Sequence, residues 1–556
     1  MNGYRFTLHP ESFALHCSAA GIPLVPLANE QFTVECARGD WAAASVVIES
    51  EMPYLLAITT APCLSKFPGR PVLRVEAECL APVTLAPVAQ LPDDDGTLRA
   101  DLLLTGDSVE VEGVTQLWVE TAIPADTAPG DYTCTLRFFA HAGLADEMCI
   151  QTLSFPIRVW NKQLPETGGM HLDLWQHPSN IARKHETPLW SEAHFRVLKP
   201  YLASLAELGQ SVATVIASEM PWSGQCSHLE PDYPSDLFEY SMIRVEKDAA
   251  GEYHYDFSVL ERYLALCERY GIDAEYEVFG LINIWVHPEV GHTGVAEDFP
   301  DAIRIVYRDA DGCKRYMRTA AEISDYIRAL EGFFVETGRI DRVRVVADEP
   351  ADLSLHIERL KNLRAIAPRL RFKCAINHLE FLDQLDEWVD DYVPCLPYLK
   401  DIEGLRARVS GRLCHYLCCW PDYPNTFLRS PLLEGRLIGA LTAYYKLDGF
   451  LRWNYTVWPE HPREKISYHP SDWKAGDTNF VYPSNNGTPL LSLRYKALKR
   501  GMEDYRLIVA GGNPAWENII FTPNLDAWYG EGADPKKLYS TDYEDYSAFR
   551  ASLLKE

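Results

Sequence analysis

The sequence predicts an α/β protein in which a β-sandwich precedes a (β/α)8 barrel. Two patterns support this prediction: the residues up to about 165 show only strand signals, and the following residues alternate between strand and helix signals through eight units. Eight such units are the number that closes a parallel barrel. The chain has 556 residues, 47% of them hydrophobic, which is enough for two domains with cores of their own.

Residues 1–165 are expected to form the β-sandwich domain. Short runs of β-branched and aromatic residues, such as 44–49 and 132–138, are separated by turn clusters such as Asp-Asp-Asp-Gly at 93–96. The segment 159–165 is predicted to contain the last strand of this domain and the exit to the next one.

Eight strands are predicted after residue 165, with helical patterns between them. The helical segments have apolar residues at spacings of three and four, so we expect the strands and helices of a barrel over residues 166–510, with 511–556 as a C-terminal tail packed on it. A doubly wound open sheet is the competing fold, but no Gly-rich phosphate loop follows the first strand. The predicted strands are 170–176, 212–218, 273–281, 343–348, 371–377, 392–399, 413–420 and 449–455, and examples of the helices are 193–208, 258–270, 321–337, 353–366 and 433–447.

Composition argues against several partners and locations. A formal net charge of −27 would repel nucleic acid and anionic membrane surfaces. The first ten residues have no basic stretch followed by an apolar run, and no segment approaches the roughly 20 apolar residues of a membrane span. The 14 cysteines are scattered through expected core elements, so reduced thiols and a cytoplasmic location are predicted. A homo-oligomer is compatible with the sequence.

Asp348 and Glu349 are the candidate catalytic residues. The segment 342–350, Arg-Val-Arg-Val-Val-Ala-Asp-Glu-Pro, runs a β-branched strand into two adjacent carboxylates and a proline. In a barrel of parallel strands the carboxyl end of each strand faces the active site, and two acids there suggest acid/base chemistry on a sugar. The alternative is that Asp348 caps a helix beginning near Leu353 while Glu349 is solvated.

No metal or cofactor is expected. Cys414, His415, Cys418 and Cys419 are close in sequence, but alternation along a strand sends neighbours to opposite faces, and no second cluster of ligand spacing complements them. Buried thiols explain these residues better.

A succession of short motifs resembles the catalytic domain of glycoside hydrolase family 123, the β-N-acetylgalactosaminidases, and its many uncharacterised relatives. The resemblance covers roughly residues 165 to 510, and a leading β-sandwich is usual in that group. The motif set is specific for the superfamily and much less so for the substrate. The motifs are Ala-Asp-Glu-Pro at 347–350, Pro-Asn-Thr-Phe at 424–427, Glu-Gly-Arg-Leu-Ile-Gly at 434–439, Asp-Gly-Phe-Leu-Arg-Trp at 448–453, Ala-Gly-Asp at 475–477, Val-Tyr-Pro at 481–483, Ser-Leu-Arg at 492–494 and Gly-Met-Glu-Asp-Tyr at 501–505.

The resemblance implies substrate-assisted catalysis by Asp348 and Glu349, which match the adjacent Asp-Glu pair of the family. Asp348 would hold the acetamido N–H of the sugar and stabilise the oxazolinium ion, while Glu349 would protonate the leaving oxygen and later deprotonate water. A retaining enzyme with its own nucleophile needs two carboxyl groups about 5 to 5.5 Å apart on opposite sides of the anomeric carbon, which adjacent residues reach with difficulty. The implied activity is a retaining exo-glycosidase for terminal β-linked N-acetylgalactosamine on an oligosaccharide or glycoconjugate.

Six further residues are candidates for sugar contacts. Aromatic rings suit the C–H faces of a pyranose, and neighbouring polar groups fix its hydroxyls. Alternatively, Asp477 closes a turn and Arg494 pairs with an acid outside the barrel. The candidates for the pocket wall are Tyr398, Trp420 and Trp453, and those for hydroxyl contacts are Asn377, Asp477 and Arg494.

Two other functions remain open from the sequence. The first is a retaining or inverting glycosidase for a sugar without the acetamido group, with Glu349 as the acid and Glu275, Glu277 or Asp477 as its distant partner. The second is a non-catalytic carbohydrate-binding protein that keeps the fold.

Overall fold

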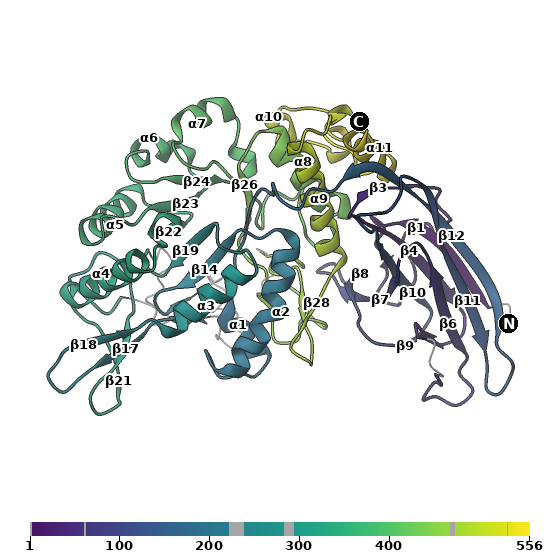
Figure 1. Cartoon of the computed structure of the whole chain (residues 1–556), viewed down its shortest axis with the longest axis horizontal. Helices are drawn as coiled ribbons and strands as arrows, with labels where there is room; N and C mark the ends of the chain where they lie inside the picture. The colour runs from purple at the N-terminus through teal and green to yellow at the C-terminus, as the bar shows by residue number, and fades with distance from the viewer. Residues whose placement is uncertain are drawn as a thin grey trace.

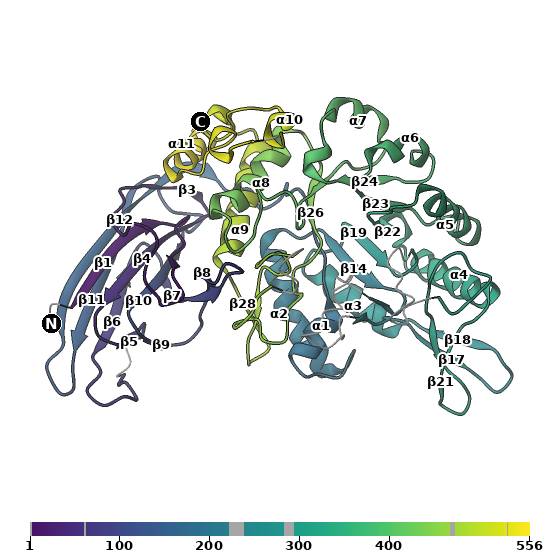
Figure 2. The same cartoon turned by 180° about the vertical axis from the view of Figure 1, so that it is seen from behind.

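The computed structural model describes residues 3–59, 63–221, 238–282, 294–467, 473–530 and 532–555. Figure 1 shows the N-terminal strands at one end of the molecule and a set of parallel strands with surrounding helices at the other. Helix α9 (Leu493–Val509) lies between the two parts, and helix α11 (Tyr543–Leu554) lies beside the N-terminal strands (Figures 1 and 2).

The N-terminal part consists of two six-stranded sheets with a shared core. Val46 and Leu117 from the first sheet meet Leu136 and Ile157 from the second, and all four are fully buried. In sheet order, the first sheet contains β1 (Tyr4–Pro10), β4 (Trp41–Ser50), β10 (Val114–Ala122), β7 (Val83–Pro92), β8 (Leu98–Leu103) and β2 (His16–Cys17), and the second contains β3 (Val34–Arg38), β12 (Met148–Gln163), β11 (Gly130–His141), β6 (Val72–Glu78), β5 (Tyr54–Ala57) and β9 (Ser108–Val111).

All eight strands predicted after residue 165 are present, although most are shorter than expected. Five of them form one sheet and three form another, and every pairing within both sheets is parallel. Isolated parallel bridges between Leu172 and Gln210 and between Cys395 and Tyr416 link the edges of the two sheets. In sheet order, the strands are β14 (Val212–Ile216), β19 (Glu275–Phe279), β22 (Val343–Asp348), β23 (Phe372–Ile376) and β24 (Asp391–Pro394), and β13 (His171–Leu174), β26 (Gly449–Arg452) and β25 (His415–Tyr416).

Helices follow these strands and cover their outer side (Figure 1). Polar side chains cap the starts of three of them: Ser191 caps α2, Thr319 and Glu322 form a capping box on α4, and Asp352 caps α5. These helices are α1 (Pro178–Lys184), α2 (Glu192–Leu208), α3 (Ser258–Arg269), α4 (Ala320–Glu336), α5 (Leu353–Ile366), α6 (Leu382–Leu385), α7 (Ile402–Arg408) and α8 (Leu432–Tyr444), and the C-terminal segment adds α10 (Leu525–Trp528).

In the described parts of the connections, eight short strands lie outside the predicted elements. They have two to four residues each, and several of those residues are exposed and charged, so they show no run of β-branched residues. Four of them build a small sheet in the order β18 (Tyr253–Asp256), β17 (Arg244–Lys247), β20 (Val306–Arg308) and β21 (Lys314–Tyr316), and the others pair as β15 (Met220–Pro221) with β16 (Phe238–Glu239) and β27 (Tyr482–Pro483) with β28 (Pro489–Leu490).

The N-terminal sheets are joined to the rest of the chain by both apolar and charged contacts. Trp41 and Trp118 share a core cluster with Leu432 and Leu493 of helices α8 and α9. Strand β8 also forms a β-bridge with the residue before α9, Ser492. No helix within the described ranges is long and apolar enough to cross a membrane.

Candidate active site

Asp348 and Glu349 lie at the carboxyl end of β22, as the sequence predicts. Asp348 is the last residue of the strand and is aligned with Ala375 on β23, and the backbone N–H of Glu349 donates to the Ala375 carbonyl at 2.9 Å. Both side chains are half-buried. The helix that follows is capped by Asp352, whose carboxylate accepts the backbone N–H of Leu355, so the interpretation of Asp348 as the cap is wrong.

Glu349 has an unusual backbone conformation. Its φ of 47° lies in the left-handed region, which costs a residue with a side chain about 1–3 kcal/mol and is maintained only by the surrounding structure. Such positions cluster at active sites, because they aim a side chain in a direction that a regular strand would not. The turn after β22 therefore presents two successive carboxyl groups at the strand end.

The environment of Glu349 favours a protonated carboxyl group. Burial raises the pKa of Glu349, while the hydrogen bond from the Tyr416 hydroxyl and the nearby His378 act in the opposite direction. Burial likewise raises the pKa of Tyr416 well above its usual value, so this hydroxyl keeps its proton and remains a donor. A raised pKa is the direction that a carboxyl group needs in order to give a proton to a leaving oxygen.

Tyr416 is a site residue that the sequence analysis missed. It belongs to β25, and the preceding residue, His415, contacts the Thr442 hydroxyl of helix α8 at 2.9 Å on the outer side. Because neighbours on a strand point to opposite faces, Tyr416 points to the inner side. The same alternation, applied to the predicted strand 413–420, could have identified it.

Tyr398 and Trp420 form one aromatic group near the carboxyl pair. Their ring centroids lie 5.6 Å apart, and Trp420 is 42% exposed, a large value for a tryptophan. The charge of Glu349 is among the influences that raise the pKa of Tyr398, after burial and Cys395, so this group lies close to the acid. Tyr529, from the segment after α10, extends the group with its ring 5.9 Å from Trp420.

Trp453 and Asp477 form a second group. Asp477 Oδ1 accepts hydrogen bonds from Arg452 Nη2 at 2.7 Å and from Trp453 Nε1 at 3.2 Å, and all three residues are buried. Asp477 Oδ2 has no hydrogen-bond partner among the described residues. Burial raises the pKa of Asp477, with Arg452 acting against it.

The thiol of Cys419 is influenced by the charges of both Asp477 and Glu349. Its hydrogen bond to Cys418 and its burial raise the pKa of its thiol, and the charges of Asp477 and Glu349 contribute in the same direction. Both carboxyl groups therefore lie within electrostatic reach of one side chain. The structure thus brings Asp477 to the same side of the parallel strands as Glu349.

Asn377 and Arg494 have different surroundings. Asn377 follows β23, is half-buried, and its Oδ1 has no hydrogen-bond partner among the described residues. Arg494 is 3% exposed, and its guanidinium donates to Asp101, to the Tyr482 hydroxyl and to backbone carbonyls. These acceptors use all five N–H groups, so Arg494 has a structural role in place of the expected hydroxyl contact.

Glu275 and Glu277 are not placed to act with Glu349. Glu277 is aligned with Arg344 on β22. Arg344 precedes Asp348 by four residues, so the backbone of Glu277 lies about 13 Å along the strand direction from the end that carries Asp348. Both glutamates are buried and lie 3.0 Å from Lys373 Nζ, which also pairs with Asp173. Burial acts to raise the pKa of Glu275, but this pKa is held below its usual range by Lys373, His171 and Arg412. The structure therefore contradicts the idea that either glutamate is the distant catalytic partner.

This interior cluster also has the geometry of a cation site, because ligand oxygens of Asp173, Glu275 and Glu277 lie within 4.8 Å of one another. The Lys373 ammonium already supplies a positive charge in contact with all three carboxylates. The donor set therefore fits a buried lysine better than a metal ion.

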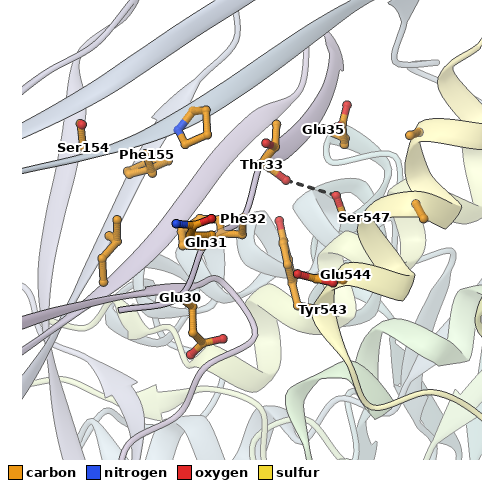
Figure 3. A pocket seen from close by; sticks show the side chains of 14 residues that line it. Glu30, Gln31, Phe32, Thr33, Glu35, Ser154, Phe155, Tyr543, Glu544 and Ser547 are labelled. Carbon is orange, nitrogen blue, oxygen red and sulfur yellow. Dashed lines mark hydrogen bonds between the residues drawn. The ribbon is translucent and has the colours of Figure 1, made fainter. Parts of the chain in front are cut away.

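A cavity of about 700 Å³ lies far from these residues, between the N-terminal sheets and helix α11 (Figure 3). Phe32, Phe155 and Tyr543 contribute rings to its wall. Three glutamates line it. Glu30 contacts His9 Nδ1 and Glu35 accepts the N–H of Trp160, both at 2.5 Å, and Glu544 is in the first turn of α11. The cavity offers no pair of carboxyl groups comparable to Asp348 and Glu349.

The family model of the glycoside hydrolase 123 catalytic domain matches residues 175–510. A solved family 123 glycoside hydrolase from Clostridium perfringens, studied for glycolipid glycan hydrolysis, superposes with a TM-score of 0.70 at 18% identity, covering 99% of this chain and 96% of that chain, which shows a shared fold. A β-D-glucuronidase from Dictyoglomus thermophilum gives a TM-score of 0.31 at 12% identity, covering 89% of this chain and 69% of that one, a likeness too low to support an argument. No curated protein sequence matches the chain.

Proposed function

Because the chain belongs to glycoside hydrolase family 123, it is a glycoside hydrolase, and we propose that it removes terminal β-linked N-acetylgalactosamine with retention, by substrate-assisted catalysis. The observation that carries this proposal is the pair at the end of β22, in which burial raises the pKa of Glu349 beside the half-buried Asp348. One group suited to proton donation and one adjacent carboxyl group are what the proposed chemistry needs.

The reaction follows from these two roles. Asp348 accepts the acetamido N–H, and the acetamido oxygen attacks the anomeric carbon as the glycosidic C–O bond breaks. Glu349 gives its proton to the leaving oxygen and then takes a proton from the water that opens the oxazolinium ion. Two displacements at one carbon retain its configuration. No enzymic nucleophile is required, which suits the burial of Glu275 and Glu277 in ion pairs with Lys373.

We propose that Tyr398 and Trp420 form a platform for the sugar chain, and that Trp453, Asp477 and Asn377 contact the terminal ring. The exposure of Trp420 and the open Oδ atoms of Asp477 and Asn377 support these roles. The substrate is then a glycoconjugate or an oligosaccharide, in line with the glycolipid glycans of the Clostridium perfringens relative.

The architecture that we propose is a closed (β/α)8 barrel over residues 166–510, with a β-sandwich over 1–165 and a C-terminal tail over 511–556. The parallel pairing within both sheets and the bridges between their edges support the barrel. The shared core of the two N-terminal sheets supports the sandwich. We further propose, from the sequence patterns alone, that the protein is cytoplasmic and needs no cofactor.

One observation favours a second candidate function, hydrolysis of a sugar without the acetamido group. Asp477 is a buried carboxyl group with an open Oδ2, and it would replace Glu275 and Glu277 as the partner of Glu349. The reaction would then be an ordinary double displacement or a single inversion, depending on the separation of the two carboxyl groups.

A set of aryl glycosides tests these functions together. We expect hydrolysis of aryl β-N-acetylgalactosaminide and inhibition by a thiazoline analogue of the oxazoline, because ligands that resemble the transition state bind far more tightly than substrate. A 2-deoxy-2-fluoro glycoside should leave no covalent sugar on the intact protein by mass spectrometry. A glycosyl adduct on Asp477 would instead establish the second function, and no hydrolysis of any glycoside would indicate a carbohydrate-binding protein.

A further inference from the structure

The turn that carries Asp477 is packed tightly against the rest of the chain. The Asp477 N–H donates to the Lys474 carbonyl at 2.9 Å and closes the turn 474–477. Gly476 has a φ of 88°, and a Cβ there would lie 2.6 Å from the backbone nitrogen of Leu428, so only glycine fits. The Leu428 N–H donates to the Ala475 carbonyl at 2.7 Å.

Asp94, in the turn between β7 and β8 of the N-terminal sheets, binds this turn directly. Its Oδ2 accepts the backbone N–H of Ala475 at 2.8 Å, and its Oδ1 accepts the hydroxyl of Ser467. Arg429 links the same N-terminal turn to the loop before α8, donating to Asp93 at 2.8 Å. The residue bound by Asp94 is thus two positions before Asp477.

Asp101, on β8, holds the turn through Arg494. The Asp101 Oδ2 lies 3.0 Å from Arg494 Nη2, and Arg494 Nη1 donates to the Gly476 carbonyl at 2.7 Å and to the Asn479 carbonyl at 2.8 Å. These two carbonyls lie on either side of Asp477. Asp101 and Arg494 are 1% and 3% exposed, so water does not weaken the pair.

We propose that Asp94 and Asp101 are positioning residues for the sugar site: they hold the turn 474–477, and so the Asp477 carboxylate, in register with Trp453 and Glu349. The role of these two residues in the sugar site rests on the proposed function, in which Asp477 contacts the terminal ring. A site on a loop is less well fixed than one on a strand, and a misplacement of about 1 Å can cost 10²-fold in rate. The N-terminal sheets supply the rigidity that the loop lacks.

Glu120 provides a matched control for a general effect on the interface. It is also a carboxylate of the N-terminal sheets, on β10, and it pairs with Lys496 Nζ at 2.8 Å. Lys496 is on the same helix as Arg494, two residues further on, but neither Glu120 nor Lys496 contacts the turn 474–477 in the described part of the structure. Glu120→Gln therefore perturbs the interface without touching the Asp477 turn.

Hydrogen exchange on the ligand-free full chain tests, independently of activity, whether Asp94 and Asp101 hold the turn 474–477. Asp94→Ala should increase amide exchange of peptides covering 474–481 by roughly tenfold or more, because a hydrogen bond between a charged group and a backbone N–H is lost. Asp94→Asn keeps an acceptor oxygen for the neutral N–H of Ala475 and should restore slow exchange. Asp101→Asn removes the charge that pairs with the buried Arg494 and should resemble Asp94→Ala. Unchanged exchange in Asp94→Ala, or an equal increase in Glu120→Gln, would overturn the inference.

Kinetics with an aryl glycoside then tests whether holding the turn 474–477 contributes to activity. Asp94→Ala should lower kcat/KM by roughly 10- to 100-fold, with Asp94→Asn close to wild type and Glu120→Gln within about twofold. A loosened turn with unchanged kcat/KM would overturn the positioning role. An inactive wild type would overturn the proposed function. The exchange measurement alone would then support or overturn the inference that Asp94 and Asp101 hold the turn 474–477.

Discussion

Two groups of carboxylates on the parallel strands differ in whether a lysine lies beside them. In the interior group, Asp173, Glu275 and Glu277 surround the Lys373 ammonium and are almost completely buried. At the strand end, Glu349 accepts a hydrogen bond from a neutral tyrosine and, among the described residues, has no lysine or arginine within ion-pair distance. The residue types are the same, and what differs is the charge placed beside them.

This difference separates structural from catalytic carboxylates. In the interior group, Lys373 helps to hold the pKa of Glu275 below its usual range against burial, while burial raises the pKa of Asp173 and Glu277. Removing the lysine would leave these buried carboxylates without a cation in a low dielectric. A carboxyl group that is buried without a cation can change its protonation state at moderate pH, which acid/base catalysis requires. The comparison predicts that substitutions in the interior group affect stability first, and that those at the strand end affect turnover first.

The largest expected effect is on stability, in the interior group. Lys373→Met removes the cation between three buried carboxylates and should lower the free energy of unfolding by about 3–5 kcal/mol. Urea denaturation measures this change. Lys361→Met, on the exposed face of α5, is the matched control and should change stability by less than about 0.5 kcal/mol. Equal stability of the two variants would show that the interior carboxylates do not depend on Lys373.

Glu349→Gln is expected to show the next largest effect, on turnover. The variant should fold normally but lose roughly 10²–10⁴-fold in kcat on glycosides with poor leaving groups, because the leaving oxygen is no longer protonated. Aryl glycosides with good leaving groups should lose much less. The comparison of the two substrate classes is the measurement, with the exposed Glu358→Gln of α5 as control. An equal loss on both classes would show that Glu349 is not the acid.

Local patterns in the sequence predict most of the elements and the carboxyl pair. A β-branched run that ends on Asp348 and Glu349 predicts the carboxyl pair, and apolar residues at spacings of three and four predict helices α2, α4 and α5. Lys373 and Arg494 could not be interpreted in the same way. Arg494 binds Asp101, 393 residues away, and Lys373 binds Asp173, 200 residues away, so both partners depend on how distant strands come together.

Asp348→Asn should reduce turnover by a smaller factor than Glu349→Gln on poor leaving groups. Its proposed role is to orient the acetamido group and to balance charge that exists only near the transition state, so kcat should fall by roughly 10²–10³-fold while KM changes little. Steady-state kinetics on the N-acetylated aryl glycoside measures kcat and KM separately. A large rise in KM with kcat preserved would indicate that Asp348 contributes ground-state binding, and would argue against substrate assistance.

The smallest expected effect concerns Tyr416 and is a shift in pH dependence. Glu349 must be protonated to act as the acid, so activity is present below its pKa and is lost as the pH rises through that pKa. Burial raises the pKa of Glu349, and the hydrogen bond from Tyr416 opposes this by stabilising the charged form. Tyr416→Phe removes the opposing contribution, so the alkaline decline of kcat/KM should move to higher pH. Tyr445→Phe, whose hydroxyl bonds the Pro523 carbonyl far from Glu349, should leave the profile unchanged. A decline that moved to lower pH in Tyr416→Phe would mean that Tyr416 stabilises the protonated form of Glu349, which contradicts the assignment of Tyr416 as a donor to this carboxyl group.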